Sequence, residues 1–439
     1  MKVLLIGGGG REHALGWKIA QSSLLSTLYV QQGNPGLDSL GEPVDLDETN
    51  HADVISFCKR NHVDLVVVGP EAPLAAGISD ALTGPGIACF GPSANAAKLE
   101  TSKSFTKEIC SKAGIPTASY GRFDRFDEAS AFLRTMSAPY VVKADGLAAG
   151  KGVVIAASLV EADNAIHEML EGKFGDAGAS IVIEEFLPGE EASLFVLCDG
   201  TRSIALAGAQ DHKRAFDGDE GPNTGGMGAY SPAPVLSPGV QERAMREIIT
   251  PTLAQMSKDG MPYVGVLYAG LMIDQDAPKL VEYNVRFGDP ECQVLMRRME
   301  SDILPFLAGA ANGHLPNDDV SWRDDPCALV VMASKGYPDK YDKGSTIKGV
   351  DAADACPGVE VFHAGTQQKG DALVASGGRV LNVTATGDTL SSAVRSAYGA
   401  IDMIDWPEGF FRSDIGHRAL GPSPQDSQGA SVASMDRLP

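Results

Sequence analysis

The sequence predicts an α/β protein of several domains. These are an N-terminal doubly wound parallel sheet, a central α+β domain with an inserted lid, and a small β-rich C-terminal domain. Over the first hundred residues, short apolar strands alternate with helices, which is typical of a parallel sheet covered on both faces. From residue 138 the apolar runs lengthen and glycine-rich loops separate them. A chain of 439 residues is also long enough for about two to four domains.

The N-terminal domain is expected over residues 1–100. Its short apolar runs predict strands at 1–7, 26–33, 64–70 and 86–92. Amphipathic segments between them predict helices at 11–22, 51–61 and 73–84. A helix rich in lysine, at 93–113, then leads into the next domain.

The central domain is expected over residues 101–320, and about 120–185 form its lid. In the lid we expect a strand, a glycine loop and a strand at 139–156, a helix at 160–172 and a strand at 180–187. Helices follow at 238–257 and 291–311, with a hairpin at 270–284 that turns at Gln275–Pro278. The C-terminal domain, 321–420, has predicted strands at 326–334, 358–366 and 377–387 and a helix at 390–401. Residues 421–439 are rich in Ser, Pro, Gly and Gln and are expected to be disordered.

The charge, the apolar runs and the cysteines of the chain indicate which partners and which cell compartment to expect. The net charge of −21 would repel nucleic acid and an anionic membrane. No apolar run reaches the length of about 18 residues that a membrane span needs, and the N-terminus does not resemble a signal peptide. Seven scattered cysteines without a C-x-x-C pair indicate a reducing compartment. We therefore expect a cytoplasmic protein, a monomer or weak dimer, that acts on small molecules.

The first strand ends in four glycines at the expected start of a helix. Backbone N–H groups and the positive helix end there would suit a phosphate. The dinucleotide motif G-x-G-x-x-G/A fails because Glu12 stands at its last position, and the second strand ends in glutamines rather than an acid. A dehydrogenase is therefore disfavoured, and a tight turn without a ligand stays an alternative.

A strand lysine, Lys143, precedes a glycine-rich loop at Gly146–Gly152. This loop is not a Walker A motif, because only three residues separate Gly146 from Gly150 and Gly152 stands where Ser or Thr is required. It could fold over a triphosphate and donate its amides while Lys143 neutralises charge. An ordinary glycine hairpin is the alternative.

A later strand carries Glu282, Asn284 and Arg286 at alternating positions, so that all three would share one face. Carboxylate and amide oxygens are suitable ligands for Mg²⁺, and two protein ligands suffice because the ion keeps water and takes phosphate oxygens. The arginine could hold a transferring phosphoryl group. A solvated β face is the alternative, but the adjoining Phe-Gly-Asp-Pro-Glu makes the pattern specific.

The chain resembles the glycinamide ribonucleotide synthetase (phosphoribosylamine–glycine ligase) family of the ATP-grasp superfamily. The matching stretches run in order from residue 7 to residue 419: GGGGREHAL, VVGPEAPL, VVKADGLAAGKGV, IVIEEFLPGEEAS, QDHKRAFDGDEGPNTGGMGAYSPAP, GVLYAGLMI, VEYNVRFGDPE, VFHAGT, GGRVLNVTA and FRSDIGHRA. The resemblance implies a pre-ATP-grasp domain, an ATP-grasp domain and a C-terminal domain. It also implies a reaction in which ATP phosphorylates glycine and 5-phosphoribosylamine attacks the resulting acyl phosphate. Glycinamide ribonucleotide, ADP and phosphate would be the products, within purine biosynthesis.

The resemblance also implies roles for particular residues. Those expected to bind ATP are Lys103, Lys143, Gly146, Gly150, Lys151, Gly152, the adenine hinge Glu184, Glu185, Phe186 and Leu187, and Glu190 or Glu191 at the ribose. Those expected to bind the other substrates are Gly9, Gly10, Arg11, Glu71, Asn223, Thr224, Gly225, Gly226, Met227, Arg286 and Asp289. Those expected to be catalytic are Arg286, Lys143, Asp211 and Lys213, and the separate roles around Asp211–Lys213 stay open.

One Mg²⁺ (or Mn²⁺) between Glu282 and Asn284 is expected. Many superfamily members carry an acid on the preceding strand, whereas this chain reads Tyr268-Ala269-Gly270-Leu271-Met272-Ile273 there, which puts a second ion in doubt. Two other readings remain: a different ATP-grasp ligase or carboxylase, and a nucleotide-binding protein without catalysis. The motifs around Asn223 and Asp289 argue against the first, and the retained Lys143, Glu282, Asn284 and Arg286 argue against the second.

Overall fold

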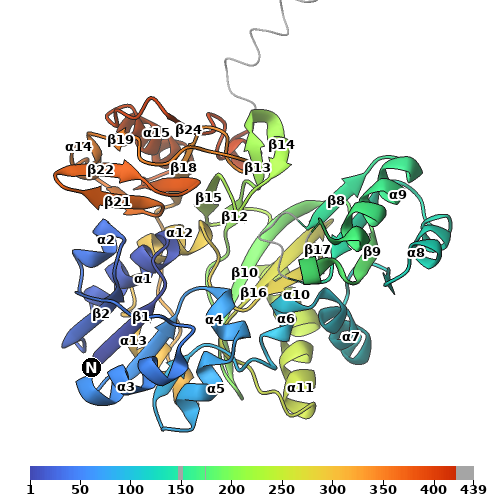
Figure 1. Ribbon diagram of the computed structural model, residues 1–439, viewed down its shortest axis with the longest axis horizontal. Coiled ribbons are helices and arrows are strands. Elements are labelled where there is room, and N and C mark those ends of the chain that lie inside the picture. Colours follow the sequence, from blue (N-terminus) through green and yellow to red (C-terminus); the bar gives the residue numbers. More distant parts are fainter. Residues whose placement is uncertain (147–151, 174, 422–439) are drawn as a thin grey trace, which may run out of the picture.

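The structure is a computed structural model that describes residues 1–146, 152–173 and 175–421. Residues 422–439, where disorder was expected, lie outside the described residues. Figure 1 shows the N-terminal domain (blue) and the C-terminal domain (orange and red) next to each other on the left, and the lid on the right, beyond the central sheet. Among the described helices, none combines the length and the apolar character needed to cross a bilayer.

The N-terminal domain is a parallel five-stranded sheet in the order β3-β2-β1-β4-β5. Its strands are β1 (Lys2–Ile6), β2 (Thr27–Gln31), β3 (Glu42–Val44), β4 (Leu65–Val68) and β5 (Ala88–Phe90). Its helices are α1 (Gly10–Ala20), α2 (Pro35–Asp38), α3 (His51–Asn61), α4 (Glu71–Ala75) and α5 (Ile78–Thr83). β1 and β4 are almost wholly buried, which explains their uninterrupted apolar sequences.

Three helices predicted as continuous are each divided in two. The segment 73–84 breaks at Gly77, whose φ of +87° does not fit a helix. The segment 93–113 becomes α6 (Lys98–Thr101) and α7 (Lys103–Ala113), because Ser102 is extended and its hydroxyl caps α7 by accepting from Phe105 N–H. The segment 291–311 becomes α12 (Glu291–Arg298) and α13 (Leu304–Ala311), because Met299 is extended and forms a β-bridge with Trp322.

The central domain has two antiparallel four-stranded sheets. The main sheet, in the order β11-β10-β16-β17, contains β10 (Glu190–Asp199), β11 (Ser203–Ala205), β16 (Val264–Asp274) and β17 (Ala277–Asn284). The lid sheet, in the order β6-β9-β7-β8, contains β6 (Tyr120–Phe123), β7 (Tyr140–Ala144), β8 (Val153–Ala156) and β9 (Ile181–Glu185), with α8 (Phe126–Leu133) and α9 (Leu159–Glu168). The main sheet is flanked by α10 (Pro238–Ala244) and α11 (Thr250–Lys258). Gln275 and Asp276 both have positive φ and form the tight β16–β17 turn of the predicted hairpin.

The C-terminal domain includes two strands that precede it in the chain. Its large sheet, in the order β12-β15-β18-β23-β20, contains β12 (Gln210–Asp211), β15 (Gly228–Ser231), β18 (Cys327–Ser334), β20 (Val359–His363) and β23 (Arg379–Thr386), and β24 (Gly409–Phe410) pairs with β18. A smaller sheet contains β19 (Thr346–Ile347), β22 (Ala372–Ala375) and β21 (Thr366–Lys369). The helices are α14 (Val350–Asp354), α15 (Leu390–Ile401) and α16 (His417–Leu420). Because β12 and β15 border the segment 212–227, that segment is anchored in the C-terminal sheet.

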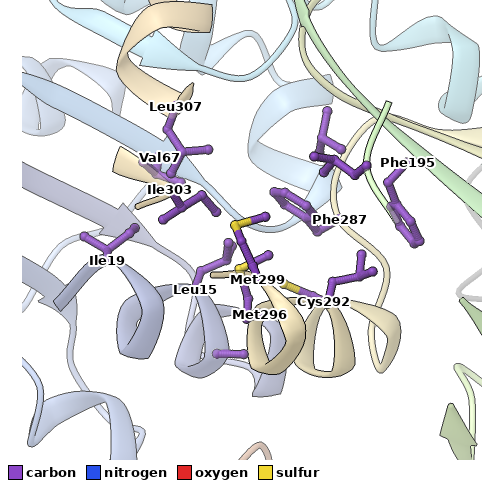
Figure 2. Packing of buried hydrophobic residues seen from close by; sticks show 14 of the residues in the cluster. Leu15, Ile19, Val67, Phe195, Phe287, Cys292, Met296, Met299, Ile303 and Leu307 are labelled. Atoms are coloured by element: carbon purple, nitrogen blue, oxygen red, sulfur yellow. The ribbon is translucent and has the colours of Figure 1, made fainter. Parts of the chain in front are cut away.

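One apolar core joins the N-terminal and central domains. Figure 2 shows Leu15 of α1 next to Met296 of α12, and Ile19, Ile303, Leu307 and Phe287 belong to the same cluster. All of these side chains are at most 2% exposed. This shared, close-packed core holds the N-terminal and central domains in a fixed arrangement.

Candidate active site

A large cleft lies where the three domains and the lid meet. Its volume is about 800 Å³, within the usual range for ligand sites. Its wall includes most of the predicted site residues: Arg11, Glu71, Lys103, Lys143, Gly146, Gly152, Glu184, Glu185, Phe186, Leu187, Glu191, Asp211, Lys213, Asn223, Thr224, Gly225, Glu282, Asn284, Arg286 and Asp289. Predicted residues 150 and 151 lie outside the described residues.

Buried lysines line the lid end of this cleft. Lys143 on β7 and Lys107 on α7 both pair with the carboxylate of Glu184, at 3.0 and 3.3 Å. Lys103 Nζ donates to the carbonyl of Gly146 at 3.2 Å. Burial lowers the pKa of Lys103 and of Lys107. Lys107 and Lys143 thus share one carboxylate, and Lys103 donates to a backbone carbonyl at the same end of the cleft. Cationic groups in this place would suit a polyphosphate.

The base of the glycine loop is tied to the start of α7. The carboxylate of Asp145 accepts hydrogen bonds from the backbone N–H of Ser104 and from the hydroxyls of Ser102, Ser104 and Ser180. Burial alone would raise the pKa of Asp145, but these hydrogen bonds, above all those from Ser104, lower it. The loop therefore starts from a fixed point next to Lys103.

Carboxylates surround one lysine at the centre of the cleft. The ammonium of Lys213 pairs with Glu191 and lies 3.7 Å from Glu282 Oε1. Burial raises the pKa of Asp211 to about 7, and Glu291 and Glu191 add to the effect of burial, whereas Lys213 opposes it. For Lys213, burial alone would lower the pKa, but Glu191, Asp211 and Glu282 raise it. Burial and the neighbouring carboxylates thus favour the protonated form of Asp211, while the same carboxylates favour the charged form of Lys213.

Glu282 and Asn284 fit a divalent cation. Both line the cleft from β17, and Asn284 Oδ1 also accepts a hydrogen bond from Arg286 Nη2 at 3.1 Å. Burial would raise the pKa of Glu282, but Lys213, Lys143 and Lys103 lower it, which favours the ionised carboxylate. In the described part of the chain, no group of three or more His, Cys, Asp and Glu side chains could hold a metal ion. A bound Mg²⁺ would therefore draw further oxygens from phosphate and water.

Arg286 lies two residues beyond the end of β17, because the strand stops at Asn284 and does not extend to Arg286 as expected, and it is held by two carboxylates from other segments of the chain. Its Nη2 donates to Glu100 at 3.0 Å and its Nε to Glu71 at 3.3 Å. Glu100 also accepts from the backbone N–H of Val285 at 2.7 Å. Glu71 comes from the N-terminal domain, so Arg286 lies where the β17 side of the cleft meets that domain. Glu100 was not among the predicted residues, because nothing in its local sequence pattern distinguishes it from an ordinary acidic residue of a helix.

The glycine turn after β1 does not line the cleft, so Gly9 and Gly10 lie away from the wall on which they were expected. The N–H of Gly9 donates to Glu12 at 2.7 Å, so Glu12 occupies the turn where a dinucleotide motif would need glycine. A Cβ on Gly10 would lie 2.1 Å from the side chain of Asn382, so Gly10 faces the C-terminal domain. Arg11 reaches the cleft wall and donates to the carbonyl of Phe287 at 3.2 Å.

Further predicted residues can be placed. Glu191 lines the cleft, whereas Glu190, its alternative at the ribose, does not. His212 is fully buried, and burial lowers its pKa to about 3, so it is a neutral packed residue. Gly226 and Met227 lie behind the wall that Asn223, Thr224 and Gly225 form.

The segment 411–419 supports the centre of the cleft from the C-terminal domain. Arg412, which is 1% exposed, pairs with Asp219 and Asp414. Arg418 lines the cleft, pairs with Asp219 and donates to the carbonyl of Asp211 at 3.2 Å. These contacts fix the hairpin of β13 (Arg214–Phe216) and β14 (Glu220–Asn223), which stands between the C-terminal domain and the lid in Figure 1. No residue of this segment was among those predicted to form the site.

Two facing antiparallel sheets, with lysines on the lid side and a carboxylate–amide pair on the other, define the chain as an ATP-grasp enzyme. The phosphoribosylglycinamide synthetase family matches in three parts: its N domain at residues 1–100, its ATP-grasp (A) domain at 101–292 and its C domain at 327–418. The chain belongs to this family, the phosphoribosylamine–glycine ligases. The family, the three-domain fold and the class of ATP-dependent ligase predicted from the sequence are thereby confirmed.

Individual relatives share nearly the whole chain. The chain is 56% identical to the phosphoribosylamine–glycine ligase of Brucella melitensis, covering 96% of this chain and 98% of the relative. It is 53% identical to the chloroplastic enzyme of Arabidopsis thaliana, over 93% of this chain and 79% of that protein. The crystal structure of the Thermotoga maritima phosphoribosylamine–glycine ligase superposes with a TM-score of 0.83 at 32% identity, covering 94% of this chain and 100% of that one.

Proposed function

We propose that the chain joins glycine to 5-phosphoribosylamine in purine biosynthesis, with conversion of ATP to ADP and phosphate through glycyl phosphate. The single observation that carries the assignment of this cleft is Arg286. It lies beside Asn284 on the nucleotide side and pairs with Glu71 of the N-terminal domain on the other side. A group at this position can hold a phosphoryl group while an amine approaches from the N-terminal domain. The names of the relatives agree with this reaction.

The nucleotide would lie between the lid and the main sheet. Lys103 and Lys143 would neutralise its phosphates, and the glycine loop at 146–152 would cover them. The adenine would meet the hinge Glu184–Leu187, and the ribose would meet Glu191. Glu184 would act mainly by orienting Lys143, because its carboxylate already pairs with that lysine at 3.0 Å.

Glu282 and Asn284 would hold one Mg²⁺ or Mn²⁺. The bound ion would neutralise phosphate oxygens and draw charge from the bond that breaks. Lys213, which now lies 3.7 Å from Glu282, would contribute positive charge next to that ion. Its neighbour Asp211, whose pKa is raised to about 7, could take up a proton at neutral pH.

The reaction needs positioning more than covalent chemistry by the protein. A glycine carboxylate oxygen attacks the γ-phosphorus of ATP, the bond to ADP breaks, and Arg286 with Lys143 stabilises the charge on the transferring group. The neutral amine then attacks the acyl carbon. The amide bond forms, phosphate leaves with one oxygen of the former carboxylate, and the amine loses a proton to a base.

The phosphoribosyl group would occupy the N-terminal side of the cleft. The glycine turn and Arg11 would bind its phosphate, and Glu71 and Asp289 would contact its ribose or amine. The backbone of 223–227 would enclose glycine. The proximity of Arg11 to Phe287, next to Arg286, supports this arrangement.

Isotope transfer tests the proposal directly. With glycine labelled with ¹⁸O at both carboxylate oxygens, each phosphate released should carry one labelled oxygen, and the amide should keep the other. Release of unlabelled phosphate at the rate of product formation would contradict an acyl phosphate. Loss of phosphate release when glycine is omitted serves as the internal control.

A further inference from the structure

Arg379, on β23 of the C-terminal domain, reaches two separate segments of the cleft wall. Its Nη1 donates to the carbonyls of Gly225 and Gly226 at 2.6 and 3.2 Å. The same nitrogen donates to the carbonyl of Asp289 at 2.6 Å, and Nη2 pairs with the Asp289 carboxylate at 3.1 Å. One guanidinium therefore connects the glycine-rich segment to the turn before α12, which is more than sixty residues further along the chain.

The C-terminal domain holds Gly225 at both of its backbone polar groups. Arg379 donates to its carbonyl, and the hydroxyl of Tyr337 accepts from its N–H at 3.2 Å. Gly225 itself is exposed to the cleft, whereas Thr224 and Gly226 on either side are buried. These contacts thus fix a piece of backbone that any ligand in this end of the cleft would meet.

At Gly225 and Gly226 there is little space for a side chain. A Cβ on Gly225 would lie 3.0 Å from the guanidinium carbon of Arg379, and a Cβ on Gly226 would lie 2.4 Å from the ring of Pro290. Gly226 also has a φ of +113°, which side chains disfavour. The glycines allow the segment to lie flat against Arg379 and the 289–290 turn.

Asp289 is oriented by the same guanidinium. Its Oδ1 accepts from Gln293 Nε2 at 2.9 Å, and its other oxygen faces Arg379. Burial would raise the pKa of this carboxyl, but Arg379 and Arg11 lower it. Asp289 therefore stands ionised and fixed between the N-terminal and C-terminal domains, and its orientation depends on Arg379.

We propose that Arg379 is a positioning residue for the substrates other than ATP. It locks the backbone of 224–227 and the Asp289 carboxylate in one geometry, so that the C-terminal domain builds the glycine and amine end of the cleft. The ATP end, formed by the lid and the main sheet, does not depend on it. This inference rests on the proposed function, which supplies the identity of those substrates.

The test compares Arg379→Met and Arg379→Lys in the full chain with a matched control. Arg297→Met is that control, because Arg297 also bridges to the C-terminal domain, through the Gly358 carbonyl at 2.8 Å and the Glu360 carboxylate at 3.5 Å, but does not line the cleft. The side chains are similarly buried, at 13% exposure for Arg297 and 18% for Arg379. The measurements are KM for glycine and for 5-phosphoribosylamine, kcat, and Kd for ATP.

Arg379→Met should lower kcat/KM for glycine and for the amine by about 10²-fold, the size of effect that a misplacement of about 1 Å produces. Its Kd for ATP should stay at the wild-type value. Arg379→Lys should recover only part of the loss, because lysine keeps the charge but cannot reach four acceptors with a planar fork. Arg297→Met should keep all these constants.

Two results would overturn the inference: Arg379→Met behaving like Arg297→Met, or a loss of ATP affinity in parallel with the other constants. If Arg379→Met fails to fold, Tyr337→Phe, which removes the partner of Gly225 N–H, must raise KM for the same two substrates, and unchanged constants would overturn the inference equally. Failure of the proposed function would be seen separately, as wild-type phosphate release that does not require glycine.

Discussion

Among the described residues, the buried ammonium groups of Lys107 and Lys143 each form one ion pair. Both pair with the same carboxylate, that of Glu184. The lysine side chains are 3% and 5% exposed, and that of Glu184 is 4% exposed. Glu184→Gln keeps the shape of the side chain but leaves two buried cations side by side. We expect this change to destabilise the folded lid locally, so that the lid opens more often while the rest of the chain stays folded.

The magnitude follows from the burial. Removing one partner of a buried ion pair costs about 3–5 kcal/mol, because the remaining charge stays desolvated. If lid opening governs exchange, backbone amides of β7 and β9 should exchange about 10²-fold to a few thousandfold faster than in the wild type. Glu168→Gln is the control in the same lid, because Glu168 pairs with Lys173 on the surface, where both side chains are more than half exposed. A surface pair of this kind is worth only about 0–1 kcal/mol.

Hydrogen exchange on peptides covering 140–146 and 181–187 measures the exchange rates of these amides directly. The method suits a chain of several domains, for which a single free energy of unfolding is not well defined. A non-hydrolysable ATP analogue should restore part of the lost protection in Glu184→Gln, because its phosphates bring anionic charge to the two lysines. Equal protection in Glu184→Gln and Glu168→Gln without nucleotide would refute the reasoning.

Three further predictions test other parts of the account. Glu282→Gln should lower the rate by about 10²- to 10³-fold with the fold intact, and near-normal activity at ordinary Mg²⁺ would exclude Glu282 as a ligand. Alanine should be turned over far more slowly than glycine, because the backbone of Gly225 closes the cleft there, and comparable rates would show that this segment does not bound the amino-acid pocket. Burial, with a smaller effect of His363, lowers the pKa of His13 from 6.5 to about 3, so across that window the unfolded chain binds a proton that the folded chain does not. Stability should therefore fall with falling pH by about 1.4 kcal/mol per unit from this group. Urea midpoints between pH 6 and pH 4 should show a flatter loss in His13→Gln, and parallel losses would contradict its buried neutral state.

The elements that sequence analysis placed well are those whose signal is local. The apolar strands of the N-terminal sheet and the β16–β17 hairpin follow from runs and turns of a few residues. Charge and spacing also brought Lys143, Glu282 and Arg286 to attention, and the structure puts all three on the wall of one cleft. Their roles in catalysis stay predictions.

What sequence analysis missed depends on contacts between distant segments. The break after Arg298 depends on a bridge from Met299 to Trp322, which helical periodicity cannot show. Strand β15 joins the C-terminal sheet through β18, about a hundred residues further along the chain. Arg379 and Arg418 reach the cleft from that domain through backbone carbonyls and carboxylates whose sequence positions carry no common pattern.

The central claim is that this cleft couples ATP cleavage to the joining of glycine and 5-phosphoribosylamine. The most direct measurement is phosphate release from ATP by the purified protein with Mg²⁺, with both substrates present and with each omitted in turn. We expect rapid release that matches the formation of glycinamide ribonucleotide only when both are present. Release at the full rate without glycine, or without the amine, would contradict the account.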